Sequence, residues 1–81
     1  MPDVRRMKAI VEAALKRIDP AAIAGGNFYD DASGRLFVTI FKGPRKISVA
    51  LRERDFSDGN AERVNRAIEA GISRLAQSPI G

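Results

Sequence analysis

Residues 35–53 read RLFVTIFKGPRKISVALRE, and the alternation of side chains in this stretch decides the fold. Successive side chains of a β-strand point to opposite faces, so one face here is aliphatic and the other mixes aromatic, hydroxyl and basic groups. The aliphatic face holds Leu36, Val38, Ile40, Ile47, Val49 and Leu51, and the mixed face holds Arg35, Phe37, Thr39, Phe41, Lys46, Ser48, Ala50 and Arg52. The stretch predicts a hairpin of two strands, 35–42 and 45–53, with its aliphatic face in the core.

The N-terminal segment predicts an amphipathic helix over residues 3–18. Its apolar residues recur at spacings of three and four, as on one stripe of a helix. They are Val4, Met7, Ile10, Val11, Ala14, Leu15 and Ile18. Asp3 is the expected N-cap, and Asp19-Pro20 is the expected stop because the residue before a proline is pushed out of helical geometry.

The connection between this helix and the hairpin predicts two short elements. Residues 20–24 are expected to form one extra helical turn, capped by Asp19 and ended by Gly25-Gly26. Residues 27–30 are expected to form a short edge strand. The following residues 31–34 have the composition of a hairpin turn.

A second helix is expected over residues 58–77, with Ser57, Asp58 or Asn60 as its N-cap. Its apolar stripe comprises Val64, Ala67, Ile68, Gly71, Ile72 and Leu75. Glycine inside a helix costs roughly 1 kcal/mol relative to alanine. We therefore expect Gly71 to approach the sheet or the first helix closely.

The predicted order is helix, three antiparallel strands, helix, which makes residues 1–81 one small α+β domain. Each helix has a single apolar stripe and the sheet has one apolar face. These surfaces bury one another when both helices pack on the same face of the sheet as two layers. This arrangement leaves the side of the sheet that carries Phe37 and Phe41 uncovered.

The order of elements resembles that of the double-stranded RNA-binding domain, and the resemblance covers most of the chain at the level of topology. Such domains carry a lysine cluster at the start of the last helix, where this chain has Asp58-Gly59-Asn60-Ala61-Glu62. The family's glycine-proline loop precedes its first strand, whereas Gly43-Pro44-Arg45 precedes the last one here. The resemblance therefore implies a shared topology, and the family's function is not carried over.

The chain lacks the residues on which most protein catalysis depends. It contains no histidine and no cysteine, so neither an imidazole base nor a thiol nucleophile is available. The carboxylates of 30–31 and 55–62 are expected in a turn and around the start of a helix, and Gly25-Gly26 lacks the lysine of a phosphate loop. We expect no enzyme activity, no metal, no cofactor and no small-molecule substrate.

The sequence also bears on location. The absence of cysteine suits a reducing cytosol, and residues 1–6 do not lead into the apolar region of a signal peptide. No apolar stretch approaches the length of a membrane span. We therefore expect a cytoplasmic protein without a membrane partner.

The excess positive charge is concentrated on the hairpin. The net charge of the chain is +4. Within residues 35–54 there are six basic side chains and one acid, a local charge of +5: Arg35, Lys42, Arg45, Lys46, Arg52 and Arg54 against Glu53. One-sided charge of this kind favours a polyanionic partner.

Two functions follow from the mixed face. Aromatic rings among basic groups on a sheet are typical of nucleic-acid binding, with bases stacked on the rings and cations along the phosphates. The candidate contacts are Arg35, Phe37, Phe41, Lys42, Arg45, Lys46 and Arg52. Phe37 and Phe41 are separated by about 13 Å of strand, which allows two stacking positions. The alternative is a protein-interaction module or homodimer, with both rings in the interface core and the basic groups at its rim.

Overall fold

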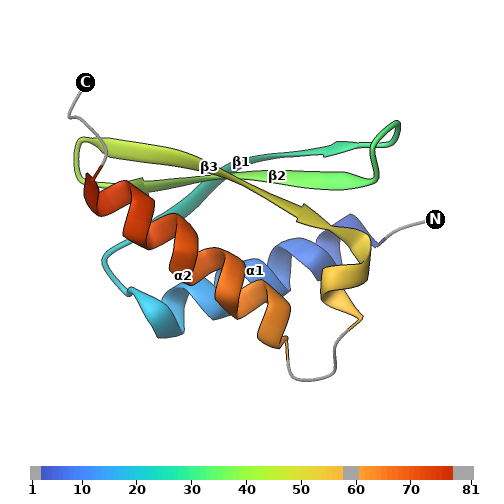
Figure 1. Ribbon diagram of the computed structural model, residues 1–81, viewed down its shortest axis with the longest axis horizontal. Coiled ribbons are helices and arrows are strands. Elements are labelled where there is room, and N and C mark those ends of the chain that lie inside the picture. The colour runs from blue at the N-terminus through green and yellow to red at the C-terminus, as the bar shows by residue number, and fades with distance from the viewer. Residues whose placement is uncertain (1–2, 58–60, 78–81) are drawn as a thin grey trace.

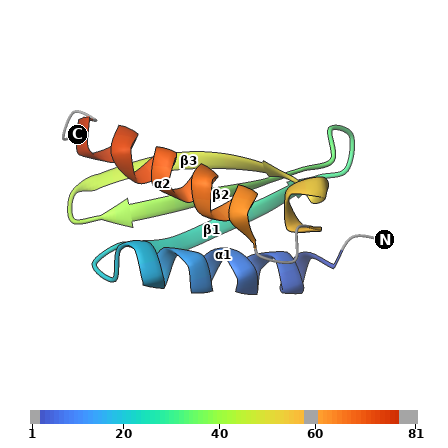
Figure 2. The same cartoon turned by 60° about the horizontal axis from the view of Figure 1, so that its bottom comes forward.

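Two helices lie on one side of a three-stranded antiparallel sheet (Figure 1, Figure 2). The computed structural model describes residues 3–57 and 61–77. Its elements are α1 (Val4–Ile18), β1 (Ile23–Asp30), β2 (Arg35–Lys42), β3 (Arg45–Arg52), the short 3-10 helix η1 (Glu53–Phe56) and α2 (Glu62–Gln77). The strand order is β1-β2-β3, with α1 packed against β1 and α2 against β3. The predicted α+β class and element order are confirmed.

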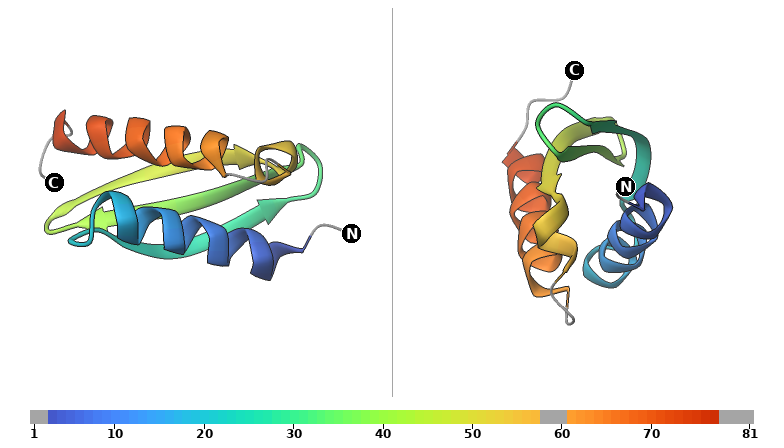
Figure 3. Two further views of the ribbon diagram at one scale, coloured as in Figure 1. Left: turned by 90° about the horizontal axis from the view of Figure 1, so that it is seen from below. Right: turned by 90° about the vertical axis from the view of Figure 1, so that its right-hand side faces the viewer.

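The core lies between the sheet and the helix pair, as the end-on view in Figure 3 shows. Side chains of β2 and β3 alternate between burial and partial or full exposure, and the buried ones belong to the predicted aliphatic face. The buried hydrophobic residues are Met7, Val11, Ala14, Leu15, Ala22, Leu36, Val38, Ile40, Val49, Leu51, Phe56, Val64, Ile68 and Leu75. Full burial of one large aliphatic side chain contributes roughly 1.5–3 kcal/mol. This burial holds both helices on the same face of the sheet.

Helix α1 begins where the sequence predicts. The carboxylate of Asp3 accepts a hydrogen bond from the backbone N–H of Arg6 at 3.0 Å, which satisfies one of the free N–H groups of the first turn. The helix ends at Ile18, and the backbone N–H of Asp19 still donates to the carbonyl of Leu15 at 2.8 Å. The N-cap and the stop are thus both confirmed.

The predicted helical turn over residues 20–24 is wrong. Asp19 does form a turn, because its carboxylate accepts from the N–H of Ala21 at 3.1 Å and its carbonyl accepts from the N–H of Ala22 at 3.0 Å. The chain then becomes extended, and β1 starts at Ile23, four residues before the predicted start at 27. The reason is long-range, since Ile23 and Ala24 pair with the last part of β2.

A β-bulge interrupts β1 at Gly25 and Gly26. Gly25 lies opposite Thr39 and Asn27 lies opposite Val38, so Gly26 is the extra residue, and its φ of +57° is one that glycine adopts without strain. One extra residue moves the side chain of every later residue of the strand to the opposite face of the sheet. The bulge therefore puts Phe28 on the side of the sheet away from the helices.

Helix α2 begins at Glu62, whereas the sequence predicts a start at residue 58; Ala61 lies outside the helix, and residues 58–60 lie outside the described part of the chain. Strand β3 ends at Arg52, and η1 follows, with Phe56 buried in the core. The hydroxyl of Ser57 donates to the carbonyl of Arg54 at 2.6 Å, at the end of η1. The other two candidate N-caps, Asp58 and Asn60, lie outside the described residues.

Helix α2 rests on the sheet at Gly71. A Cβ atom at this position would lie 2.7 Å from Cγ2 of Val49, which is closer than atoms of these types approach. The missing side chain lets the helix backbone reach β3, and this contact is the close approach that the sequence predicts. Of the two expected partners, it is the sheet that meets Gly71.

Candidate functional site

The side of the sheet that faces away from both helices is called the outer face below. Figure 3 shows that neither helix covers it. Its side chains are those of Ile23, Phe28 and Asp30 on β1, of Arg35, Phe37, Thr39 and Phe41 on β2, and of Lys46, Ser48, Ala50 and Arg52 on β3. The structure thus brings together five of the seven predicted site residues on one surface.

Two phenylalanines form a pair on neighbouring strands of the outer face. Phe28 and Phe37 are directly opposite in the β1–β2 ladder, and their ring centroids lie 6.4 Å apart with 23° between the ring planes. Phe28 is 64% exposed. Sequence reasoning missed Phe28, because its face depends on the bulge. The signal that pointed to it was the Gly25-Gly26 pair, since glycines within a strand often mark a bulge.

A third ring lies further along β2. Phe41 is 40% exposed, and its ring lies over the backbone of Gly25, where an added Cβ would be 2.9 Å from Cε2 of the ring. Its direct cross-strand neighbour on β1 is Ile23, which is 67% exposed. The outer face of β1 and β2 therefore presents a row of apolar side chains to solvent.

Basic side chains border this apolar row. Arg35 lies directly opposite Arg52, and Lys46 lies opposite Phe41. Like charges that face each other across two strands destabilise a sheet, and Asp30 of β1, which lies opposite Arg35 on its other side, offsets part of that repulsion. In the described part of the chain, none of these three cations forms an ion pair with a carboxylate. The carboxylate of Asp30 accepts from the N–H of Ala32 and the hydroxyl of Ser33 within its own turn.

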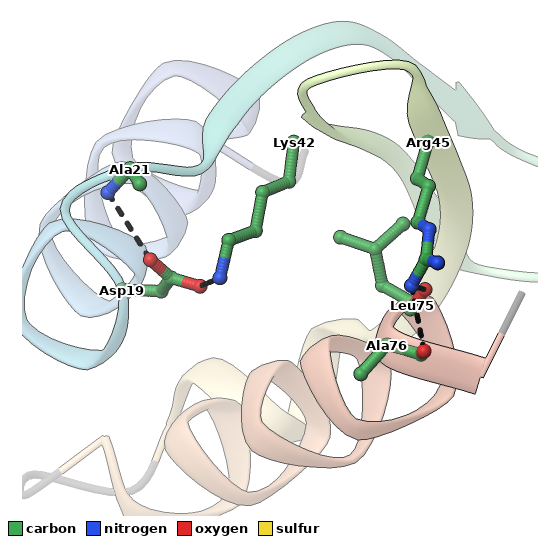
Figure 4. Close-up of polar contacts among 6 residues, drawn as sticks. All are labelled: Asp19, Ala21, Lys42, Arg45, Leu75 and Ala76. Atoms are coloured by element: carbon green, nitrogen blue, oxygen red, sulfur yellow. Dashed lines mark hydrogen bonds and ion pairs between the residues drawn. The ribbon is translucent and has the colours of Figure 1, made fainter. Parts of the chain in front are cut away.

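The other two predicted site residues, Lys42 and Arg45, lie on the helix side of the sheet (Figure 4). Lys42 Nζ is 2.7 Å from Asp19 Oδ2, just beyond the end of α1. Arg45 Nη1 donates to the carbonyl of Ala76 at 2.6 Å and, more weakly, to that of Leu75 at 3.5 Å. These carbonyls belong to the last turn of α2, where a cation also interacts favourably with the helix dipole. The hairpin tip is therefore tied to the ends of both helices.

The contact with Lys42 changes the acidity of Asp19. The hydrogen bond from Lys42 lowers the pKa of the Asp19 carboxyl, and the N–H of Ala21 lowers it further, while burial acts in the opposite direction. A carboxylate with a lowered folded-state pKa stabilises the protein above its unfolded value of about 3.9. That contribution is lost as the pH falls through the folded-state pKa.

We expect Lys42→Met to destabilise the protein at neutral pH, because it removes the partner of Asp19 and keeps most of the aliphatic stem. The difference from wild type is expected to shrink as the pH falls below the unfolded value and then through the lowered folded-state pKa of Asp19, because the carboxylate becomes protonated in both proteins. Urea denaturation at several pH values measures this difference in the free energy of unfolding. Lys46→Met on the outer face is the matched control and should show a small difference at every pH. A Lys42→Met difference that does not vary with pH would contradict this role.

Further chemistry is limited in the described residues. No three or more carboxylate side chains gather there closely enough to hold a metal ion. Burial raises the pKa of the Tyr29 phenol, and Glu53, Asp31 and Asp30 raise it further, so this group stays neutral at physiological pH. Within the same residues, neither helix is long and apolar enough to cross a membrane.

Comparison with protein-family models, with curated proteins and with solved structures finds no match to this chain.

Proposed function

We propose that this protein is a small non-catalytic binding module whose outer face holds a nucleic acid. The observation that carries the proposal is the solvent-facing pair Phe28 and Phe37, bordered on the same face by Arg35, Arg52 and Lys46. Exposed rings can stack on the bases of a nucleic acid, and the neighbouring cations can neutralise its phosphates. Lys42 and Arg45 contribute by holding the hairpin tip in place.

The sign and placement of the charge support this partner. The outer face carries three basic side chains and one acid, and that acid, Asp30, is engaged within its own turn. Each phosphate that a cation neutralises releases counterions, which makes the affinity fall steeply with salt. A nucleic acid also relieves the repulsion between Arg35 and Arg52.

The triple variant Arg35→Gln, Lys46→Gln, Arg52→Gln is expected to bind nucleic acid far more weakly than wild type. The slope of log affinity against log salt should fall by about 2–3, since each lost phosphate contact removes about 0.7–0.9. Filter binding or fluorescence anisotropy over a salt series measures both quantities.

The matched control removes the same number of charges from the helix side of the molecule. It is Arg5→Gln, Lys16→Gln, Arg63→Gln, and all three positions are exposed. This control should keep the wild-type affinity within a few-fold. Wild-type protein that binds no DNA or RNA at low salt, or two triple variants that lose affinity equally, would contradict the proposed site.

A second candidate is an interface with a protein partner or a second copy of the chain. Ile23 favours it, because this side chain is 67% exposed and has no ring on which a base can stack. Self-association face to face is opposed by the one-sided charge, since three cations of each copy would approach one another. Sedimentation that shows a dimer, made monomeric by Ile23→Ser with Phe28→Ser, would favour this candidate over the first.

We propose that the protein is cytoplasmic. A chain without cysteine forms no disulfide, so its fold does not depend on an oxidising compartment. Cytosolic RNA and DNA are available to the outer face there.

A further inference from the structure

We propose that the outer face selects single-stranded nucleic acid, with unpaired bases stacked on the rings of β1 and β2 and phosphates held along β3. This inference rests on the proposed function and names the form of nucleic acid that the site takes. It follows from the way the outer face divides into two parallel lanes. The base lane comprises Ile23, Phe28, Phe37 and Phe41, and the phosphate lane comprises Lys46, Ser48, Ala50 and Arg52.

The base lane offers two separate stacking positions. The first is the pair of Phe28 and Phe37, whose ring centroids lie 6.4 Å apart with 23° between the ring planes. The second is Phe41, four residues along β2 and therefore about 13 Å away. A single base cannot span this distance, so each position takes its own base. A strand that occupies both must run roughly along β2.

The bulge and the glycine before it build these positions. Without the extra residue at Gly26, residue 28 would point to the helix side, and Phe37 would have no aromatic neighbour on β1. Gly25 leaves the space in which the ring of Phe41 rests on the backbone of β1. Both glycines thus serve the arrangement of rings on the outer face.

The phosphate lane has a cation at each end and the small side chains of Ser48 and Ala50 between them. Lys46 lies opposite Phe41 at one end, and Arg52 lies opposite Arg35 at the other. Between them Ala50 lies opposite Phe37, so no bulky side chain of β3 blocks a base that stacks on that ring. The hydroxyl-bearing residues Thr39 and Ser48 lie opposite each other between the two stacking positions and are placed to bond base edges or sugars.

A duplex does not fit this surface in the same way. Each internal base of a double helix is covered on both faces by its neighbours, so a protein ring gains no stacking surface unless the bases separate. Phosphates of a duplex still reach the cations, which leaves only the sequence-independent electrostatic attraction. The rings therefore add affinity for single strands and none for duplexes.

The test compares oligonucleotides of about twelve nucleotides, single-stranded and in matched duplexes, by fluorescence anisotropy. Phe28→Leu and Phe37→Leu keep an apolar side chain and remove the ring. Each is expected to weaken single-strand binding by about 5- to 150-fold, to leave duplex binding unchanged and to leave the salt slope unchanged. Tyr29→Leu is the matched control, because it removes a ring from the helix side of the same strand, and it should change binding less than about 3-fold.

The outcomes separate this inference from the proposed function. Wild-type protein that binds neither form at low salt contradicts both. Equal affinity for single strands and duplexes, with Phe28→Leu and Phe37→Leu at wild-type affinity, contradicts base stacking on the rings. The protein would then be a nucleic-acid module that contacts only phosphates. Circular dichroism checks folding, and the 64% exposure of Phe28 makes its variant the better tolerated one.

Discussion

Ile40→Ala is expected to lower the free energy of unfolding by about 2–5 kcal/mol, whereas Phe41→Ala is expected to lower it by less than about 1 kcal/mol. The two residues are neighbours on β2 and point to opposite faces. Ile40 is fully buried between the sheet and the helices, so truncation leaves a cavity in the core. Phe41 is 40% exposed and loses mainly its contact with the backbone of Gly25. The larger side chain is therefore the cheaper one to remove.

Urea denaturation of both variants measures this difference. Small domains are stabilised by only about 0.05–0.15 kcal/mol per residue, so Ile40→Ala removes much of the total. A cost for Phe41→Ala as large as that for Ile40→Ala would mean that something covers the outer face in solution. Stability that rises with protein concentration would then identify the cover as a second copy of the chain.

Gly71→Ala is expected to destabilise the protein by about 1–2 kcal/mol, although alanine is the better helix former by about 1 kcal/mol. The added methyl group would meet Cγ2 of Val49 at 2.7 Å. Val49 is itself buried, so it has little room to move aside. Helix α2 must then tilt away from β3, and the apolar contacts along the helix loosen with it.

A double-mutant cycle with Val49→Ala tests whether this contact is the cause. In the Val49→Ala background, Gly71→Ala should be neutral or stabilising, because the obstructing methyl is gone and the gain in helix propensity remains. Ala70→Gly, at the exposed neighbouring position of α2, is the control for propensity and should cost about 1 kcal/mol. Equal effects of Gly71→Ala in both backgrounds would show that the contact with Val49 does not matter.

Features that depend on residues close together in the chain followed from the sequence. The alternation over residues 35–41 and 46–52 assigned the outward and inward side chains of β2 and β3 correctly, because the two-residue period of a strand is local. The stripes of both helices and the cap at Asp3 were local signals as well. They were enough to predict the α+β order, both helices on one face and an uncovered surface with Phe37 and Phe41.

The rest depended on pairing over long distances. The start of β1 at Ile23 and the bulge at Gly26 exist because β2 offers a partner along its whole length, and only that pairing shows that Phe28 joins Phe37. Lys42 and Arg45 lie an even number of residues from core positions of their strands, so the strand period places them on the helix side. The groups that they contact there lie 23 and 31 positions away in the sequence and could not be predicted from it. The sequence by itself determined the elements and the two faces of the hairpin. Tertiary structure alone decided which rings meet and which cations are engaged, because both depend on residues that only folding brings together.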